Sequence, residues 1–243
     1  MRRRKSHYWF FFTVGLCFIS CQPEDERPSV IVNDAPSENA INKNINFIAL
    51  GDSYTISEGI SLTDNWPNQL TFELRTNHEY EINTDIVAET GYRVIDLTSA
   101  LKNTNFDHPY SLVSIMIGVN DQFIGIPIER FRSDLVTLVQ FIKAEPSFTN
   151  SKIFFVSIPD WGYTPFGTNY DLNAVSESID DYNAVIRSIS TQFNIEYIDI
   201  TRISRRSKND WSLVISDGLH PNEEMYSSWV ELILAKVLIM LKK

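Results

Sequence analysis

Five short apolar segments recur between residues 45 and 200, and each is nearly continuous rather than alternating with polar residues. Such runs are typical of strands that are buried on both faces of a parallel sheet. The intervening stretches are long enough for helices, so strands and helices alternate along the chain. The five predicted strands are Ile45–Leu50, Ile82–Ala88, Ser111–Ile117, Ile153–Ile158 and Ile195–Ile200.

Two segments carry apolar side chains at helical spacing, and these stripes are expected to face a core. One predicted helix, near Pro127–Ala144, is marked by Phe131, Leu135, Leu138 and Ile142; the other, with Asn222 as its N-cap, is marked by Met225, Trp229, Ile233 and Val237. The alternation predicts a three-layer α/β/α domain with a doubly wound, five-stranded parallel sheet. The economical strand order is 2-1-3-4-5, as in flavodoxin-like folds.

The first twenty residues have a different character. Arginines and a lysine occupy positions 2–5, the segment Tyr8–Ile19 is apolar, and Ser20 precedes Cys21. This pattern predicts a secretory signal peptide over residues 1–20, with an apolar part too short to span a bilayer. The junction at Cys21 resembles the lipobox of bacterial lipoproteins, in which the cysteine is lipidated. An ordinary signal peptide with an incidental cysteine is the alternative.

Residues 21–44 are predicted to be the lipidated cysteine and a flexible acidic tether, and residues 45–243 the folded domain. Three prolines and the acidic run Glu24–Glu26 fall in this tether. The run resembles a surface-export signal of Bacteroidetes-type lipoproteins. The expected location is the bacterial cell envelope, on the periplasmic side or at the outer-membrane surface, with the lipid as the membrane anchor.

The net charge limits the possible partners, and the cysteine content limits the possible disulfides. The formal net charge of the whole chain is −10, which argues against a nucleic-acid partner and against adsorption to anionic lipid through charge. After removal of the signal peptide only Cys21 would remain, so no internal disulfide could stabilise the domain. The stability of the domain must therefore come from its apolar core.

A serine and a histidine stand in sequence contexts that suit nucleophilic catalysis. Ser53 lies on a turn directly after the first predicted strand, and residues 217–221 read Asp-Gly-Leu-His-Pro. Serine becomes an effective nucleophile when an imidazole removes its proton, and a carboxylate can fix the imidazole tautomer. Asp217 lies three residues before His220. The remaining histidines, His7, His78 and His108, lack an aspartate at such a spacing.

Two further positions follow predicted strands and could donate hydrogen bonds. Gly91 comes after the second strand, and Asn120 follows Gly118 after the third. Acyl transfer needs donors aimed at the oxyanion that forms when serine attacks a carbonyl. A glycine offers an unobstructed N–H and an asparagine offers its amide. Asp121 is expected to be mainly structural and to stabilise the loop that carries Asn120.

The order Ser, Gly, Asn, His resembles the SGNH hydrolase superfamily, also called GDSL-type esterases and lipases, over residues 46–241. This resemblance implies hydrolysis of carboxylic ester bonds, in acyl or acetyl esters of lipids or carbohydrates, without a cofactor or metal. It implies a triad of Ser53, His220 and Asp217, and an oxyanion hole formed by the N–H groups of Ser53 and Gly91 and the side chain of Asn120. The segment Gly51–Thr55, which contains Ser53, departs from the commonest form of the family motif at Tyr54, where leucine is usual.

Other interpretations of these residues remain open. Ser53 could simply cap a helix, and Asp217 and His220 could be half of a metal site, although no second histidine or cysteine accompanies them. A flavodoxin-like FMN carrier could place the hydroxyls of Ser53, Thr55 and Ser57 on a phosphate, and an inactive surface binding module is a further alternative. The Gly-x-Ser-x-Gly motif of the nucleophile elbow does not occur.

The substrate is not defined by the motifs. Residues 159–167 follow the fourth predicted strand and include Trp161, Tyr163 and Phe166. These aromatic side chains could form an acyl pocket or a platform for a sugar ring, or they could simply pack the loop against the domain.

Overall fold

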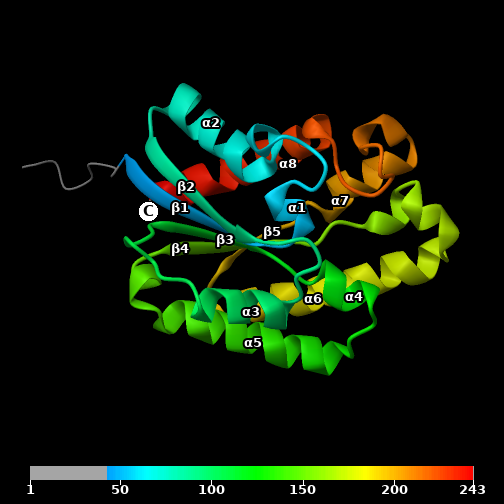
Figure 1. Cartoon of the computed structure of the whole chain (residues 1–243), viewed down its shortest axis with the longest axis horizontal. Helices are drawn as coiled ribbons and strands as arrows, with labels where there is room; N and C mark the ends of the chain where they lie inside the picture. The colour runs from blue at the N-terminus through cyan, green and yellow to red at the C-terminus, as the bar shows by residue number, and fades with distance from the viewer. Residues whose placement is uncertain (1–42, 243) are drawn as a thin grey trace, which may run out of the picture. The chain divides into compact units, whose positions relative to one another are not determined.

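Five parallel strands form the centre of the described part of the chain, which is residues 43–242 of the computed structural model (Figure 1). Their order is β2-β1-β3-β4-β5, so the predicted fold class and strand order are confirmed. The strands are β1 (Asn44–Gly51), β2 (Glu81–Ala88), β3 (Leu112–Met116), β4 (Lys152–Val156) and β5 (Glu196–Ile198).

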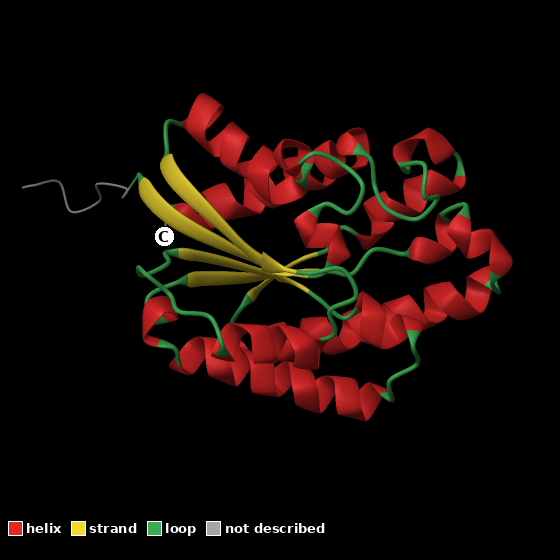
Figure 2. Cartoon of the chain, viewed as in Figure 1, coloured by secondary structure: helices red, strands yellow, loops and turns green. Residues whose placement is uncertain are grey.

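Helices cover both faces of the sheet (Figure 2). On one face α2 (Trp66–His78) packs against α8 (Glu223–Leu241). On the other face α5 (Ile128–Ala144) packs against both α3 (Val94–Lys102) and α6 (Leu172–Phe193). The shorter elements are α1 (Ser53–Ile56), α4 (Val119–Phe123), α7 (Thr201–Ser204) and the 3₁₀ turns η1 (Leu62–Asp64), η2 (Pro146–Phe148), η3 (Trp161–Tyr163), η4 (Phe166–Asn169), η5 (Arg205–Lys208) and η6 (Trp211–Leu213).

Both helices predicted from apolar stripes are present. Helix α5 begins at Ile128 with Pro127 as its N-cap residue, one residue later than predicted. Asn222 caps α8 as expected, because its Oδ1 accepts a hydrogen bond of 2.9 Å from the Met225 N–H. The predicted core stripes of both helices are buried.

Two strands differ from the continuous buried runs that the sequence suggested. β2 lies at the edge of the sheet, and its residues alternate between exposed and buried near its start. β5 is only three residues long. It ends early because the N–H groups of Ile200 and Thr201 donate to the Ser157 hydroxyl, at 2.9 and 3.1 Å, rather than to a neighbouring strand. This side-chain contact turns the chain into α7.

The structure describes neither residues 1–42 nor residue 243. The predicted signal peptide, Cys21 and nearly all of the predicted tether therefore lie outside the described residues. Within residues 43–242 no helix combines the length and the apolar character that a bilayer span requires.

The strand order brings distant segments of the chain to one edge of the sheet. β1 lies between β2 and β3, and the carboxyl ends of all three parallel strands point the same way. In doubly wound sheets ligands bind at this edge, where successive connections leave toward opposite faces. The segments after β1, β2 and β3 carry Ser53 at the start of α1, Gly91 in a turn and Asn120 in α4, respectively.

Candidate active site

Ser53 is the first residue of α1, the short helix that follows β1. Its neighbour Asp52 is the N-cap: Oδ1 of Asp52 accepts from the Tyr54 N–H at 3.0 Å. The carbonyl of Asp52 accepts from the N–H groups of Thr55 and Ile56, at 2.9 and 3.0 Å. The hydroxyl of Ser53 is therefore not used as a helix cap, which removes the simplest alternative for this residue.

Ser53 lies in hydrogen-bond contact with His220, although 167 positions separate them. The distance from Ser53 Oγ to His220 Nε2 is 2.9 Å, and that from His220 Nδ1 to Asp217 Oδ2 is 2.6 Å. Ser53 is 5% exposed and His220 is 7% exposed. The three side chains thus form one continuous hydrogen-bonded chain at the carboxyl edge of the sheet.

The turn between Asp217 and His220 lets the carboxylate reach the ring. Gly218 within this turn has a φ of +74°, a conformation that favours glycine. Oδ1 of Asp217 accepts from the N–H groups of Leu219 and His220, at 2.7 and 3.0 Å, which leaves Oδ2 facing the ring. Partial burial opposes ionisation, but the hydrogen bonds from the His220 ring and these two N–H groups outweigh it and lower the pKa of Asp217.

Gly91 and Asn120 face the same cavity as Ser53 and His220. Gly91 has a φ of +85°, and a β-carbon built there would meet nothing within 4 Å, so its backbone borders open space. One N–H of the Asn120 amide donates to the Tyr92 carbonyl at 2.9 Å. This bond fixes the orientation of the amide and leaves its second N–H for another acceptor.

Two buried carboxyl groups support the loops that carry these residues. Oδ2 of Asp121 accepts from the Val94 N–H at 3.0 Å, which ties α4 to the first residue of α3, in line with the structural role expected for Asp121. Burial raises the pKa of Asp121 to about 6, although the bond from Val94 acts in the opposite direction. Burial likewise raises the pKa of Asp52 to about 7, and the nearby Asp121 adds to this effect.

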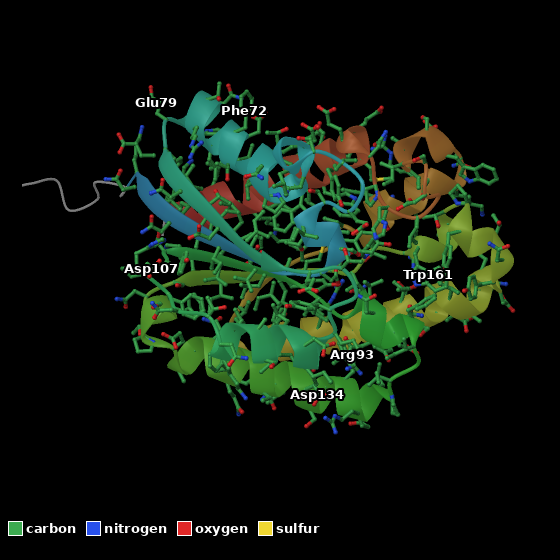
Figure 3. The ribbon with its side chains drawn as sticks, viewed as in Figure 1. Phe72, Glu79, Arg93, Asp107, Asp134 and Trp161 are labelled. Atoms are coloured by element: carbon green, nitrogen blue, oxygen red, sulfur yellow. The ribbon has the colours of Figure 1, made fainter. Side chains whose placement is uncertain are left out.

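The cavity in front of Ser53 has a volume of about 230 Å³. Trp161 and Phe166 of the aromatic loop line it, whereas Tyr163 lies under the cations of Arg205 and Lys208. Figure 3 shows Trp161 at the end of the domain where the loops after the strands gather. The loop therefore both packs against the domain and contributes to the cavity.

Several further residues line the cavity without having been predicted from the sequence, namely Tyr54, Thr90, Val119, Phe123 and Leu219. A signal existed for Phe123, because it lies three residues after Asn120 and residues at this spacing share one face of a helix. Leu219 and Tyr54 could have been inferred only as neighbours of His220 and Ser53.

Two alternatives from the sequence find no support in this geometry. Within residues 43–242 no group of three or more histidine, cysteine or acidic side chains is arranged to hold a metal ion. Thr55 and Ser57, whose hydroxyls would contact phosphate in a flavodoxin-like FMN carrier, are 0% and 5% exposed. Of the three hydroxyls in this alternative, only that of Ser53 therefore borders the cavity.

Comparison with known sequences points to one family. The sequence profile of the GDSL-like lipase/acylhydrolase family matches residues 49–227. A multidomain esterase from Ruminococcus flavefaciens is 29% identical to the chain over 127 residues, which are 49% of the chain and 15% of that protein. The chain thus corresponds to only a small part of this relative.

Solved structures share the fold at low sequence identity. A lipolytic protein of the G-D-S-L family from Veillonella parvula superposes with a TM-score of 0.63 at 18% identity, covering 78% of this chain and 96% of that one. The psychrotrophic esterase EstA from a Pseudoalteromonas species gives a TM-score of 0.63 at 18% identity, with coverage of 82% and 99%. An acetyl xylan esterase from Geobacillus stearothermophilus gives 0.64 at 18% identity, with coverage of 79% and 94%.

Proposed function

The chain belongs to the GDSL-like lipase/acylhydrolase family, and from this premise we propose that it is a serine esterase that hydrolyses carboxylic ester bonds, in acyl or acetyl esters of lipids or carbohydrates, through Ser53, His220 and Asp217. The observation that carries the proposal is the hydrogen-bonded chain from Ser53 Oγ through the His220 ring to Asp217, with distances of 2.9 and 2.6 Å. No metal or cofactor is required for this chemistry.

In the proposed reaction His220 is the general base. Its Nδ1–H donates to Asp217, so Nε2 is free to accept the proton of the Ser53 hydroxyl as Oγ attacks the ester carbonyl. The same Nε2–H then donates that proton to the leaving alcohol. Water repeats the sequence on the acyl-enzyme and releases the acid. The ionised Asp217 stabilises the imidazolium formed in both halves of the reaction.

The oxyanion would be received by three donors. As the first residue of α1, Ser53 has an N–H without an intrahelical acceptor. The N–H of Gly91 and the second N–H of the Asn120 amide are the other two donors. The open space beside Gly91 and the bond that orients Asn120 toward the cavity support these roles.

Covalent labelling by a fluorophosphonate tests the nucleophile. The wild-type protein should be labelled at Ser53 and should hydrolyse p-nitrophenyl acetate, whereas Ser53→Ala should lose both properties. Ser57→Ala is the matched control, because Ser57 lies one turn further on and is equally buried at 5% exposure. Labelling of the Ser53→Ala variant, or activity of this variant close to that of the wild type, would refute the proposal.

The proposal extends to the location of the enzyme. The basic residues 2–5, the apolar segment Tyr8–Ile19 and the Ser20-Cys21 junction support export and lipidation at Cys21. The lipid would hold the domain at the bacterial cell envelope, and residues 22–43 would be the tether. Wild-type protein should fractionate with membranes and Cys21→Ser should not. Wild-type protein that is cleaved before Cys21 but carries no lipid would reduce the proposal to a plain secreted enzyme.

A further inference from the structure

Four aromatic side chains from two loops form a mutual cluster at the mouth of the active-site cavity. Phe123 comes from α4, Trp161 from η3, Phe166 from η4, and Tyr170 directly follows η4. Every pair of these rings is in contact, with centroid distances from 5.0 to 6.2 Å. All except Tyr170 line the cavity in front of Ser53. We call this group the aromatic niche.

The aromatic niche has the chemistry of an apolar subsite rather than a sugar platform. Trp161 lines the cavity but is only 4% exposed, and its indole N–H is already bonded, so it offers a ligand neither a broad ring face nor a free donor. The two exposed rings, Phe123 at 47% and Tyr170 at 45%, meet at 65° and present no common flat face. Sugar hydroxyls placed against the rings of Phe123 and Phe166, which line the cavity, would lose water without gaining partners, which is unfavourable.

One side chain connects the aromatic niche to the oxyanion site. Gln122 is 8% exposed, and its Oε1 accepts a buried hydrogen bond of 2.8 Å from the Trp161 Nε1–H. Gln122 lies in α4 between Asn120 and Phe123. This five-residue helix therefore carries the proposed oxyanion donor, one ring of the niche, and the acceptor that holds another ring of the niche.

We propose that the aromatic niche binds the apolar part of the ester, and that Gln122 is a positioning residue whose bond to Trp161 fixes α4 and hence Asn120. The inference rests on the proposed esterase function and deepens it. A chain bound in the niche contacts Phe123 and the part of Trp161 that lines the cavity, on both sides of the Gln122 bond. Binding there stabilises the arrangement in which Asn120 faces the developing oxyanion, so selectivity should be expressed in kcat as well as in KM.

The substrate class is tested with two series of esters. One series lengthens the acyl chain of p-nitrophenyl esters from acetate to octanoate, and the other lengthens the alcohol of alkyl acetates from methyl to octyl. In one series kcat/KM should rise by about threefold to fourfold per methylene until the niche is filled. The series that rises shows whether the niche receives the acyl chain or the alcohol. Flat profiles in both, with higher kcat/KM for acetylated xylose or xylan, would overturn the apolar assignment.

The role of Gln122 is tested by removing either partner of its hydrogen bond. Gln122→Met and Trp161→Phe should each lower kcat for p-nitrophenyl acetate by about tenfold with KM within about twofold, a fraction of the loss expected for an absent oxyanion donor. The double variant should lose little more than either single variant, because both remove the same bond. Gln122→Glu retains an acceptor and should restore most of kcat.

A matched control separates positioning from stability. Tyr110→Phe removes a hydrogen bond of 2.7 Å to Asp85 at the opposite end of the sheet, and should lower Tm without changing kcat. If Gln122→Met behaves like Tyr110→Phe, Gln122 is merely structural and the inference fails. The proposed function stands or falls separately: it fails if the wild type is not labelled at Ser53, whereas the positioning role fails if labelled Gln122 and Trp161 variants keep wild-type kcat.

Discussion

Two histidines lie beside carboxylates at opposite ends of the same sheet. At the carboxyl edge, the His220 side chain is 9% exposed, and its Nδ1 lies 2.6 Å from Asp217 Oδ2. At the amino edge, the His108 side chain is 38% exposed, and its Nε2 lies 3.3 Å from Asp85 Oδ2. Figure 3 labels Asp107, the neighbour of His108, and Trp161 of the active-site cavity, and the two labels mark these opposite ends.

The third partner distinguishes the two pairs. The His220 Nε2, which does not face Asp217, contacts the Ser53 hydroxyl. At the other end it is Asp85 that has the extra partner, because the Tyr110 hydroxyl donates to its Oδ2 at 2.7 Å. Burial and this bond to a carboxylate raise the pKa of Tyr110, so the phenol remains protonated. A histidine beside an aspartate can activate a nucleophile only where the fold also places one against the ring, and in the proposed function Ser53 is that nucleophile.

The largest expected difference lies between the two histidines themselves. His220→Ala should lower kcat for p-nitrophenyl acetate by roughly 10⁴–10⁶, because Ser53 loses its base. His108→Ala should leave kcat within about twofold. Both variants are measured at saturating substrate, with Tm recorded to confirm folding. A loss above tenfold in His108→Ala would mean that the amino-edge pair contributes to the reaction after all.

The two aspartates sharpen the same comparison. Asp217→Asn should cost on the order of 10⁴ in kcat, since the amide would favour the wrong imidazole tautomer. Asp85→Asn keeps an oxygen acceptor for Tyr110 and should have no effect on kcat. Near-normal turnover in Asp217→Asn would show that Asp217 only shapes the turn, through its bonds to Leu219 and His220.

Two asparagines allow a matched test of the oxyanion hole. The amide of Asn120 donates to the Tyr92 carbonyl at 2.9 Å, and that of Asn46, at the amino edge, donates to the Pro109 carbonyl at 3.0 Å. Asn120→Ala should lower kcat by about 10²–10³ with KM nearly unchanged, because the donor matters most once charge develops. Asn46→Ala should leave both constants unchanged. A raised KM with normal kcat in Asn120→Ala would make Asn120 a substrate-binding residue.

The sequence predicted the arrangement of the strands better than the contacts between distant side chains, for a physical reason. Buried strands and the turns that follow them leave local patterns, so the fold class, the strand order and the resemblance to SGNH hydrolases could be inferred and are confirmed, as is the enzyme class. The pair of His108 with Asp85 was missed because it joins a loop to an edge strand across 23 positions without a motif. Tertiary contacts also shortened β5, through the Ser157 hydroxyl.

The clustering of the four rings in the aromatic niche could not be predicted from the sequence. Trp161 and Phe166 were recognisable as aromatic residues after a strand, but three functions stayed open for them. Phe123 and Tyr170 come from segments that carry no local signal for a shared cluster. Only the folded geometry shows that Trp161 is largely covered and bonded to Gln122, and on this detail we base the proposal of an apolar subsite rather than a platform.

The smallest expected effect concerns Asp121, which supports the active-site loop without touching the cavity. Its pKa is raised by burial to about 6, from an ordinary value of 3.8. Between these values the unfolded chain has lost the proton while the folded protein retains it. Folding then takes up a proton, so this group makes the wild-type protein less stable as pH rises through this window.

Asp121→Asn should remove this contribution while its amide oxygen still accepts from the Val94 N–H. The free energy of unfolding should be measured with urea at pH 4, 5, 6 and 7. The difference between the variant and the wild type should shift in favour of the variant by about 1–3 kcal/mol from pH 4 to pH 6. Asp52, whose pKa is raised to about 7, should still make the stability of both proteins fall up to that pH. Turnover at pH 7 should remain within about threefold, in contrast to Asn120→Ala one residue away. Parallel curves of unfolding free energy against pH for the two proteins would mean that Asp121 is already ionised in the folded state. A large loss of kcat would mean that Asp121 takes part in the reaction and does not only support α4.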